Sequence, residues 1–167
     1  MEAFLKPLQP DEEANWEIIQ RMLYIYCKLC NQKYVQGMHE IITPIYYVML
    51  TQPDSSLQKY CEVDTFFCFN QLMIELHSNY FIREMVDTYG IGLQIKQFDA
   101  LLKHFDLQLH SHLQKLQLEH YYYIFRWISL LLSQEFSLLN TIRLWDFVFA
   151  DDQRFRLVLF VCVAMLM

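Results

Sequence analysis

The sequence predicts an all-α fold built as a single helical domain, and three observations support that class. The 167 residues include only 3 Gly and 4 Pro, too few turn residues for a β-sandwich or barrel whose chain reverses about every ten residues. Hydrophobic residues make up 54% of the chain, enough for a sizeable core. These apolar residues recur at spacings of three and four, the period of one face of an α-helix. A chain of this length fits one domain, which we place at residues 1–167.

Boundary signals place three helices in the first half of the chain. The acidic run Asp11-Glu12-Glu13 favours a helix N-terminus, because negative charge interacts favourably with the positive end of the helix dipole. The apolar residues from Trp16 to Cys30 recur with helical spacing and are expected to face inward. Pro44 is expected to kink the second helix, and Asp64 is expected to cap the third. These helices are expected over residues 12–30, 36–50 and 64–77, with connectors at 31–33 and 51–56.

The second half of the chain predicts further helices. The run Asp87-Thr88-Tyr89-Gly90 is typical of a turn, and a periodic apolar segment follows it. The stretch from Tyr121 to Leu132 is almost wholly apolar, which predicts a buried helix, and Asn140 is expected to cap the next one. The last helix follows Asp151-Asp152, and its apolar run is shorter than the roughly 18–20 residues that cross a bilayer. These helices are expected over residues 93–105, 121–132, 140–148 and after 152, while 107–114 alternates less cleanly.

Charge and cysteine content narrow the classes of partner. A formal net charge of -6, a pI near 5.4 and the absence of a basic run argue against nucleic-acid binding, because that affinity comes from clustered Lys and Arg. The 5 cysteines are odd in number and are expected to be reduced thiols, as in cytoplasmic proteins. No secretory signal pattern opens the sequence. We therefore expect a cytoplasmic protein without a transmembrane segment.

Two groups of residues have side chains that bind metals. Cys27-Lys28-Leu29-Cys30 spaces two thiols as in redox or zinc sites, but it closes a predicted helix, where the dipole disfavours a thiolate. His104, His110 and His112 lie near Asp106, and imidazole and carboxylate are ordinary ligands for first-row metals. Residues two apart on a helix point away from each other, so these histidines are not expected to share an ion. No metal or cofactor is predicted.

The remaining signal is Tyr34-Val35-Gln36-Gly37-Met38, at the junction of the first two predicted helices. Taken alone, it describes a buried aromatic residue, a polar cap and a flexible glycine hinge. Nothing else in the chain matches a phosphate-binding loop, a metalloprotease motif or a nucleophile elbow, so no self-contained enzyme site is expected. The classes of function that remain are binding to a partner and assisting the activity of a partner.

Three later motifs give that stretch a context. They are Phe125-Arg126-Trp127, Ser133-Gln134-Glu135-Phe136 and Ile142-Arg143-Leu144-Trp145-Asp146. In this order and spacing the motifs resemble the TBC domain, the all-helical GTPase-activating domain for Rab small GTPases. The resemblance covers most of residues 14–167 and implies a partial domain, with the arginine-finger part upstream and further helices downstream.

The resemblance implies a mechanism in which an arginine and a glutamine from the activator enter the active site of the GTPase. Gln36 matches the glutamine finger, Tyr34 is expected to pack behind it, and Gly37 to allow close approach of the backbone. GTP and Mg²⁺ would be held by the Rab partner, so this chain needs no cofactor. The protein would reach endomembranes peripherally, through that partner.

The arginine half of the mechanism is missing from this sequence. The family motif I-x-x-D-x-x-R lies upstream of the glutamine, and Met1 to Lys33 contains no such pattern. Arg21 is the nearest upstream arginine, but the required Asp does not precede it. This chain is therefore expected to be a weak activator or none. A non-catalytic TBC-like scaffold that binds a GTPase or another protein is the alternative, and a fragment that folds poorly is a third hypothesis.

Three residues of the later motifs are interpreted as structural. Arg126 and Asp146 are charged residues within apolar predicted helices, and we expect them to form a buried ion pair between two helices, because an unpaired buried charge is costly. Trp145 stands beside Asp146 and is assigned to the same structural group.

Overall fold

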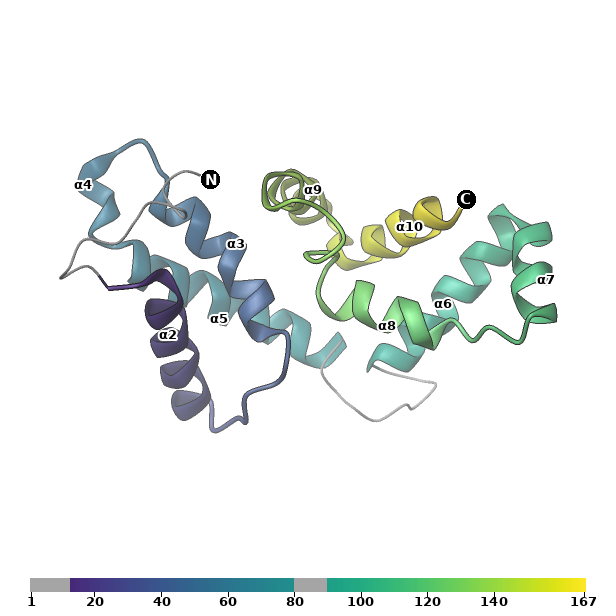
Figure 1. Ribbon diagram of the computed structural model, residues 1–167, viewed down its shortest axis with the longest axis horizontal. Helices are drawn as coiled ribbons and strands as arrows, with labels where there is room; N and C mark the ends of the chain where they lie inside the picture. The colour runs from purple at the N-terminus through teal and green to yellow at the C-terminus, as the bar shows by residue number, and fades with distance from the viewer. Residues whose placement is uncertain (1–12, 80–89) are drawn as a thin grey trace. The chain divides into compact units, whose positions relative to one another are not determined.

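The structure is a computed structural model that describes residues 13–79 and 90–167, except for the side chains of residues 77–79 and 154. Every regular element in these ranges is a helix (Figure 1), which confirms the predicted all-α class. None of these helices is long and apolar enough to cross a membrane. The turn predicted at Asp87 lies outside the described residues. The chain divides into two compact units, Met1–Ile74 and Glu75–Met167.

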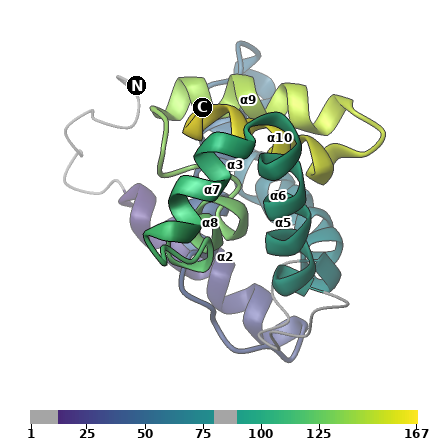
Figure 2. The same cartoon turned by 90° about the vertical axis from the view of Figure 1, so that its right-hand side faces the viewer.

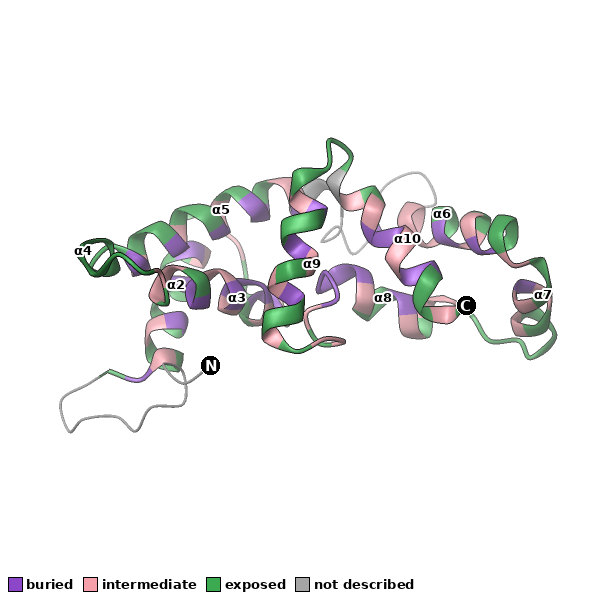
Figure 3. Cartoon of the chain, turned by 90° about the horizontal axis from the view of Figure 1, so that it is seen from above, coloured by how far each residue is buried: buried purple, intermediate pink, exposed green. Residues whose placement is uncertain are grey.

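The first unit is built on α2 packed against α3, with α5 completing the core. Its helices are α2 (Asn15–Leu29), α3 (Met38–Leu50), the short α4 (Ser55–Gln58) and α5 (Cys61–Asn79), of which residues 61–74 belong to this unit. Figure 3 shows buried and exposed residues alternating along α5, as in an amphipathic helix. The largest buried side chains include Met22, Met38, Ile41, Ile42, Tyr46, Phe69 and Met73. The rings of Tyr26 and Phe69 meet edge to face at 5.1 Å, a favoured aromatic geometry.

Three expectations for this unit need correction. The third helix begins at Cys61, so Asp64 lies in its first turn instead of capping it, although its charge still suits the helix N-terminus. The connector expected at residues 51–56 contains the start of α4, and Asp54 caps that helix by accepting a hydrogen bond from the Ser56 amide at 2.9 Å. Trp16, in the first turn of α2, and Cys30, which follows its last residue, are exposed instead of facing inward. Pro44 lies within α3 without ending it.

The second unit is organised around α10, which packs against α6, α8 and α9. Its helices are α6 (Gly90–Phe105), α7 (Leu107–Lys115), α8 (Tyr121–Ser129), α9 (Leu138–Ala150) and α10 (Arg154–Leu166). Helices α6 and α7 run side by side, and α8 also packs on α6 (Figure 2). The buried residues include Phe98, Leu102, Ile124, Ile128, Trp145, Val148, Leu159 and Cys162. The segment that alternated less cleanly in the sequence is therefore a helix, α7.

Two helix boundaries in this unit differ from the predictions. Helix α8 ends at Ser129 because Leu131 and Leu132 adopt left-handed φ angles of 48° and 62°, which a helix cannot continue through. It is only partly buried, since Tyr122 is 75% exposed. Helix α9 begins after Ser137, so Asn140 lies in its first turn and does not cap it.

Candidate functional site

The stretch from Tyr34 to Met38 forms the turn that leads from the loop after α2 into α3. Gly37 precedes the first residue of α3 with φ 107° and ψ -16°, a conformation that costs a side-chain-bearing residue steric strain. Its carbonyl accepts the first hydrogen bonds of α3, from the amides of Glu40 at 3.0 Å and Ile41 at 3.3 Å. Gly37 is also buried. Glycine is therefore required by the backbone at this position.

Met38 anchors this turn to the core of the first unit. Its side chain is 1% exposed, and its sulfur accepts a hydrogen bond from the Val35 amide at 3.5 Å. The Met38 amide donates in return to the Val35 carbonyl at 3.1 Å. These two contacts close the turn on either side of Gln36. Gln36 itself is exposed, and within the described part of the chain its carboxamide has no hydrogen-bond partner.

Tyr34 lies beside the turn and is half exposed. Its hydroxyl oxygen is 2.6 Å from Nδ1 of His39, and the two rings are stacked with centroids 6.3 Å apart. The His39 ring also contacts the Glu40 carboxylate at 3.3 Å through Nε2. His39 therefore holds Tyr34 against the first turn of α3.

A groove of about 510 Å³ runs along the same face of the first unit, between α2 and α3. It is lined by Trp16, Ile19, Gln20, Leu23, Tyr24, Cys27, Tyr34, His39 and Thr43. Trp16, Tyr24 and Tyr34 are 65%, 63% and 50% exposed. Such a gathering of aromatic rings is typical of a protein-binding surface. The sequence did not predict this groove, because Trp16 was expected among the inward-facing residues of the first helix.

Arg21, the nearest arginine upstream of Gln36, is engaged by two carboxylates. Its Nε and Nη2 atoms each donate to the Glu62 carboxylate at 2.8 Å, and Nη1 pairs with Glu13. The hydrogen bonds that Arg21 donates to Glu62, and then to Glu13, raise its pKa above the ordinary value. The forked, two-point geometry fixes the direction of the guanidinium.

The predicted pair between Arg126 and Asp146 is wrong. Arg126 is 58% exposed and its Nη2 contacts Oε1 of Glu135 at 2.6 Å, while Asp146 is exposed as well. The cause is the early end of α8, because the turn that follows brings Glu135 back to Arg126. The pair is half-buried, since the Glu135 side chain is only 17% exposed.

Trp145 is buried in the second unit. Its side chain is 4% exposed, and the indole Nε1 donates to the Leu131 carbonyl at 2.8 Å. Leu131 is one of the two residues with left-handed φ after α8. The indole therefore holds the turn between α8 and α9. The candidate residues thus fall into two groups, with Tyr34, Gln36 and Gly37 in the first unit and the other three in the second.

The thiols Cys27 and Cys30 do not form a disulfide. Burial raises the pKa of Cys27, and the nearby Cys30 adds to that shift. The Cys30 sulfur donates to Oδ1 of Asn70 at 3.6 Å. The raised pKa of Cys27 is opposite to that of an activated redox thiol, whose pKa is lowered.

Comparison with known proteins places the chain in a family. The family model described as Rab-GTPase-TBC domain matches residues 5–167. TBC1 domain family member 13 of Homo sapiens is 46% identical over 157 residues, which are 93% of this chain and 39% of that protein. A TBC domain-containing protein of Schizosaccharomyces pombe is 42% identical over 145 residues, 84% of this chain and 23% of that protein. The chain thus spans well under half the length of these relatives.

A solved structure gives the same result at the level of the fold. The crystal structure of the Ypt/Rab-GAP domain of Gyp1p aligns with 90% of this chain and 52% of its own, with a TM-score of 0.69 and 26% sequence identity. Sequence and fold therefore agree over nearly the whole chain, which belongs to the Rab-GTPase-TBC domain family.

Proposed function

We propose that this chain is part of a GTPase-activating protein for a Rab family small GTPase, and that Gln36 is the group it inserts into the partner's active site. The observation that carries the proposal is the state of Gln36: an exposed carboxamide with no hydrogen-bond partner among the described residues, on a turn whose two flanking residues are fixed. Membership of the Rab-GTPase-TBC domain family supports the Rab as partner.

The chemistry of a carboxamide suits this task. Its oxygen accepts and its nitrogen donates hydrogen bonds, so one glutamine can hold both a water molecule and a phosphate oxygen. In GTP hydrolysis a glutamine orients the attacking water in line with the γ-phosphate. The nucleotide and Mg²⁺ would belong to the GTPase, so the chain acts on a partner's active site and needs no cofactor.

The neighbours of Gln36 would serve the docking step. Gly37 lacks a side chain at the base of the turn, which allows the partner backbone to approach. The groove between α2 and α3 begins at Tyr34 and offers exposed aromatic rings. We propose that this groove receives apolar side chains of the GTPase while Gln36 enters its nucleotide site. Such docking would carry the protein from the cytoplasm to endomembranes.

The activity of this chain alone is expected to be weak. No I-x-x-D-x-x-R pattern precedes Gln36 in residues 1–33, and Arg21 is held by two carboxylates. An arginine finger contributes about 10³–10⁵ to the rate of GTP hydrolysis, so its absence leaves only the glutamine contribution. The missing motif also favours a second function, in which this chain binds a GTPase without accelerating hydrolysis.

Single-turnover GTP hydrolysis and binding, measured together across a panel of Rab proteins, test the proposal. The parent chain is compared with Gln36→Ala and with Gln32→Ala, which removes another glutamine of the same loop. We expect binding to at least one Rab, and a small acceleration that Gln36→Ala abolishes and Gln32→Ala leaves intact. Binding without acceleration in the parent chain would establish the scaffold function instead. Binding to no Rab would refute both the activator and the scaffold function. Full acceleration would show that another arginine takes the place of the arginine finger.

A further inference from the structure

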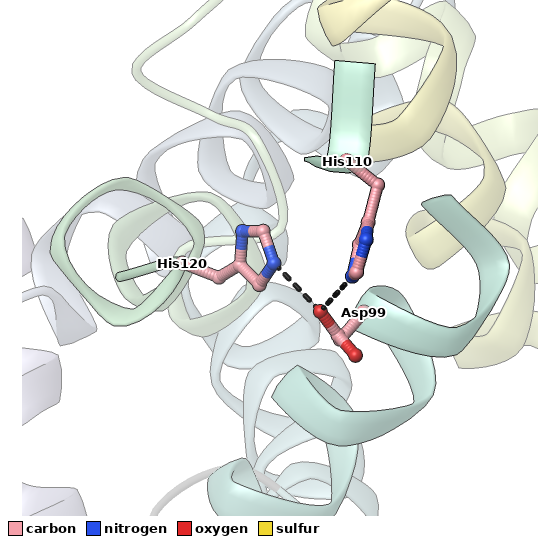
Figure 4. Close-up of side chains that lie close together, drawn as sticks. All are labelled: Asp99, His110 and His120. Carbon is pink, nitrogen blue, oxygen red and sulfur yellow. Dashed lines mark hydrogen bonds and ion pairs between the residues drawn. The ribbon is translucent and has the colours of Figure 1, made fainter. Parts of the chain in front are cut away.

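Three metal-binding side chains from three elements meet in the second unit. They are Asp99 in α6, His110 in α7 and His120 at the start of α8 (Figure 4). Both histidine Nε2 atoms point at the same carboxylate oxygen, Oδ1 of Asp99, and each lies 2.8 Å from it. The three potential ligand atoms all lie within 4.8 Å of one another. The proposed Rab function uses none of these residues.

The backbone around the cluster is firmly placed. Asp106 caps α7, its carboxylate accepting from the Leu109 amide at 2.8 Å, and its carbonyl accepts from the His110 amide at 3.0 Å. The His120 carbonyl accepts from the Ile124 amide at 2.9 Å in the first turn of α8. The donor atoms therefore need no folding of loops to come together, which is the property expected of a built ion site.

The two histidines of the cluster are shielded from solvent, whereas the aspartate is accessible. The side chain of His110 is 4% exposed and that of His120 is 12% exposed, whereas Asp99 is 40% exposed. The fully buried Phe98 ring meets the His120 ring edge to face at 5.4 Å. An ion could thus enter from the Asp99 side and keep a water ligand there, while the imidazoles stay shielded.

A contact with Tyr123 determines which ring nitrogen of His120 carries the proton. Its Nδ1 is 2.5 Å from the Tyr123 hydroxyl. With no ion, Nε2–H donates to Asp99 and Nδ1 accepts from the tyrosine. With an ion on Nε2, the ring proton moves to Nδ1 and donates to the tyrosine oxygen. A hydrogen bond of this kind on the outer ring nitrogen is a regular companion of metal-ligating histidine.

We infer that Asp99, His110 and His120 bind one divalent first-row transition-metal ion, with Zn²⁺ as the best fit and water completing its coordination. Two imidazoles and one carboxylate are ligands of that class, whereas Mg²⁺ and Ca²⁺ prefer oxygen alone. Ligand atoms at about 2.0–2.1 Å from a tetrahedral zinc lie roughly 3.3 Å apart. The two histidine–carboxylate separations of 2.8 Å therefore need to open by about 0.5 Å. The two Nε2 atoms, which lie within 4.8 Å of each other, need to reach the same spacing, and side-chain rotation can supply both changes.

The ion site differs from the set that the sequence brought to attention. His104 and His112 are exposed and Asp106 is the cap of α7, so of that group only His110 takes part. The bound ion would join α6, α7 and the start of α8. Its role would be to stabilise this part of the second unit.

Calorimetric titration of Zn²⁺ into the full 167-residue chain, reduced and freed of metals with a chelator, tests the inference. We expect one ion per chain and a raised melting temperature. Asp99→Asn and His120→Gln should each weaken the affinity more than about tenfold. The double variant His104→Gln/His112→Gln removes two exposed histidines of α6 and α7 and should bind as the parent does. Asp99→Asn keeps an oxygen that accepts from both histidines, so circular dichroism should show unchanged helix content.

The five free cysteines are the competing ligands, and Co²⁺ distinguishes them. Co²⁺ bound by the histidines and carboxylate gives d–d absorption without the intense charge-transfer band of a thiolate ligand. A thiolate band that disappears in the double variant Cys27→Ser/Cys30→Ser would overturn the inference. So would the absence of a stoichiometric Zn²⁺ site, or an affinity that Asp99→Asn and His120→Gln leave unchanged, since the three residues would then form only a hydrogen-bonded core.

Discussion

Replacing Gly37 with alanine should destabilise the first unit, while the same substitution at Gly92 should stabilise the second. Gly37 has φ 107° and is buried, and a left-handed backbone costs a residue with a Cβ about 2 kcal/mol at a φ this far from the usual left-handed well. Alanine recovers roughly 0.5 kcal/mol by restricting the unfolded chain, so the net loss is about 1.5 kcal/mol. Gly92 lies inside α6, where alanine is favoured by about 0.5–1 kcal/mol.

Urea denaturation followed by circular dichroism measures both effects. With a urea m value of about 2 kcal/mol/M, the midpoint should fall by roughly 0.7 M in Gly37→Ala and rise by up to roughly 0.5 M in Gly92→Ala. Gly37→Ala should also lower GTPase binding or stimulation, because the turn that carries Gln36 is displaced. A Gly37→Ala chain as stable as the parent, with its midpoint unchanged, would refute the requirement for glycine at this turn.

Two further predictions concern buried groups of the second unit. Trp145→Phe removes the donor to the Leu131 carbonyl and should lower the free energy of unfolding by about 1–3 kcal/mol. The control Trp16→Phe, at an exposed position of α2, should change it by less than about 0.5 kcal/mol. Equal losses in the two variants would contradict the assigned hydrogen bond. Burial raises the pKa of Cys162 to about 12, so at pH 8 a thiol reagent should modify the exposed Cys30 long before Cys162, as peptide mass mapping over time can show. Early modification of Cys162 would mean that the core around α10 opens readily.

Sequence periodicity predicted the helices well because each helix buries one face of its own. Helix α2 was expected over residues 12–30 and spans Asn15–Leu29, and the expected 36–50 helix spans Met38–Leu50. The caps at Asp64 and Asn140 were wrong since residue type favours a cap without fixing it, and the first turn of a helix tolerates the same residues.

The errors in side-chain pairing have a different origin. Arg126 and Asp146 were paired because both interrupt apolar segments, but pairing depends on where α8 ends. The left-handed φ angles of Leu131 and Leu132 end it early and place Glu135 beside Arg126. Leucine gives no sequence signal for such a conformation, which is usual for glycine and asparagine. The indole of Trp145, bound to the Leu131 carbonyl, helps to hold it.

The two candidate sites differed in how visible they were to sequence. The Gln36 turn is local, and its glycine marks it directly. In the proposed ion site, His110 and His120 follow Asp99 by 11 and 21 positions. The three residues meet only because α7 folds back along α6 and α8 follows. Proximity of histidines in sequence pointed to His104 and His112, which helical geometry turns outward to solvent.

The physical state of Gln36 separates a functional role from a structural one. An exposed side chain that has no hydrogen-bond partner in the described part of the chain contributes almost nothing to folding, and its removal should change stability by less than about 0.5 kcal/mol. The backbone beneath it is different, since Gly37 and Met38 meet strict conformational and packing demands. Stability alone explains a fixed turn, but it does not explain an unpartnered glutamine at the tip of that turn. Because Gln36→Ala should leave the fold intact, any effect it has on GTP hydrolysis by a bound Rab reports the chemistry of the carboxamide itself.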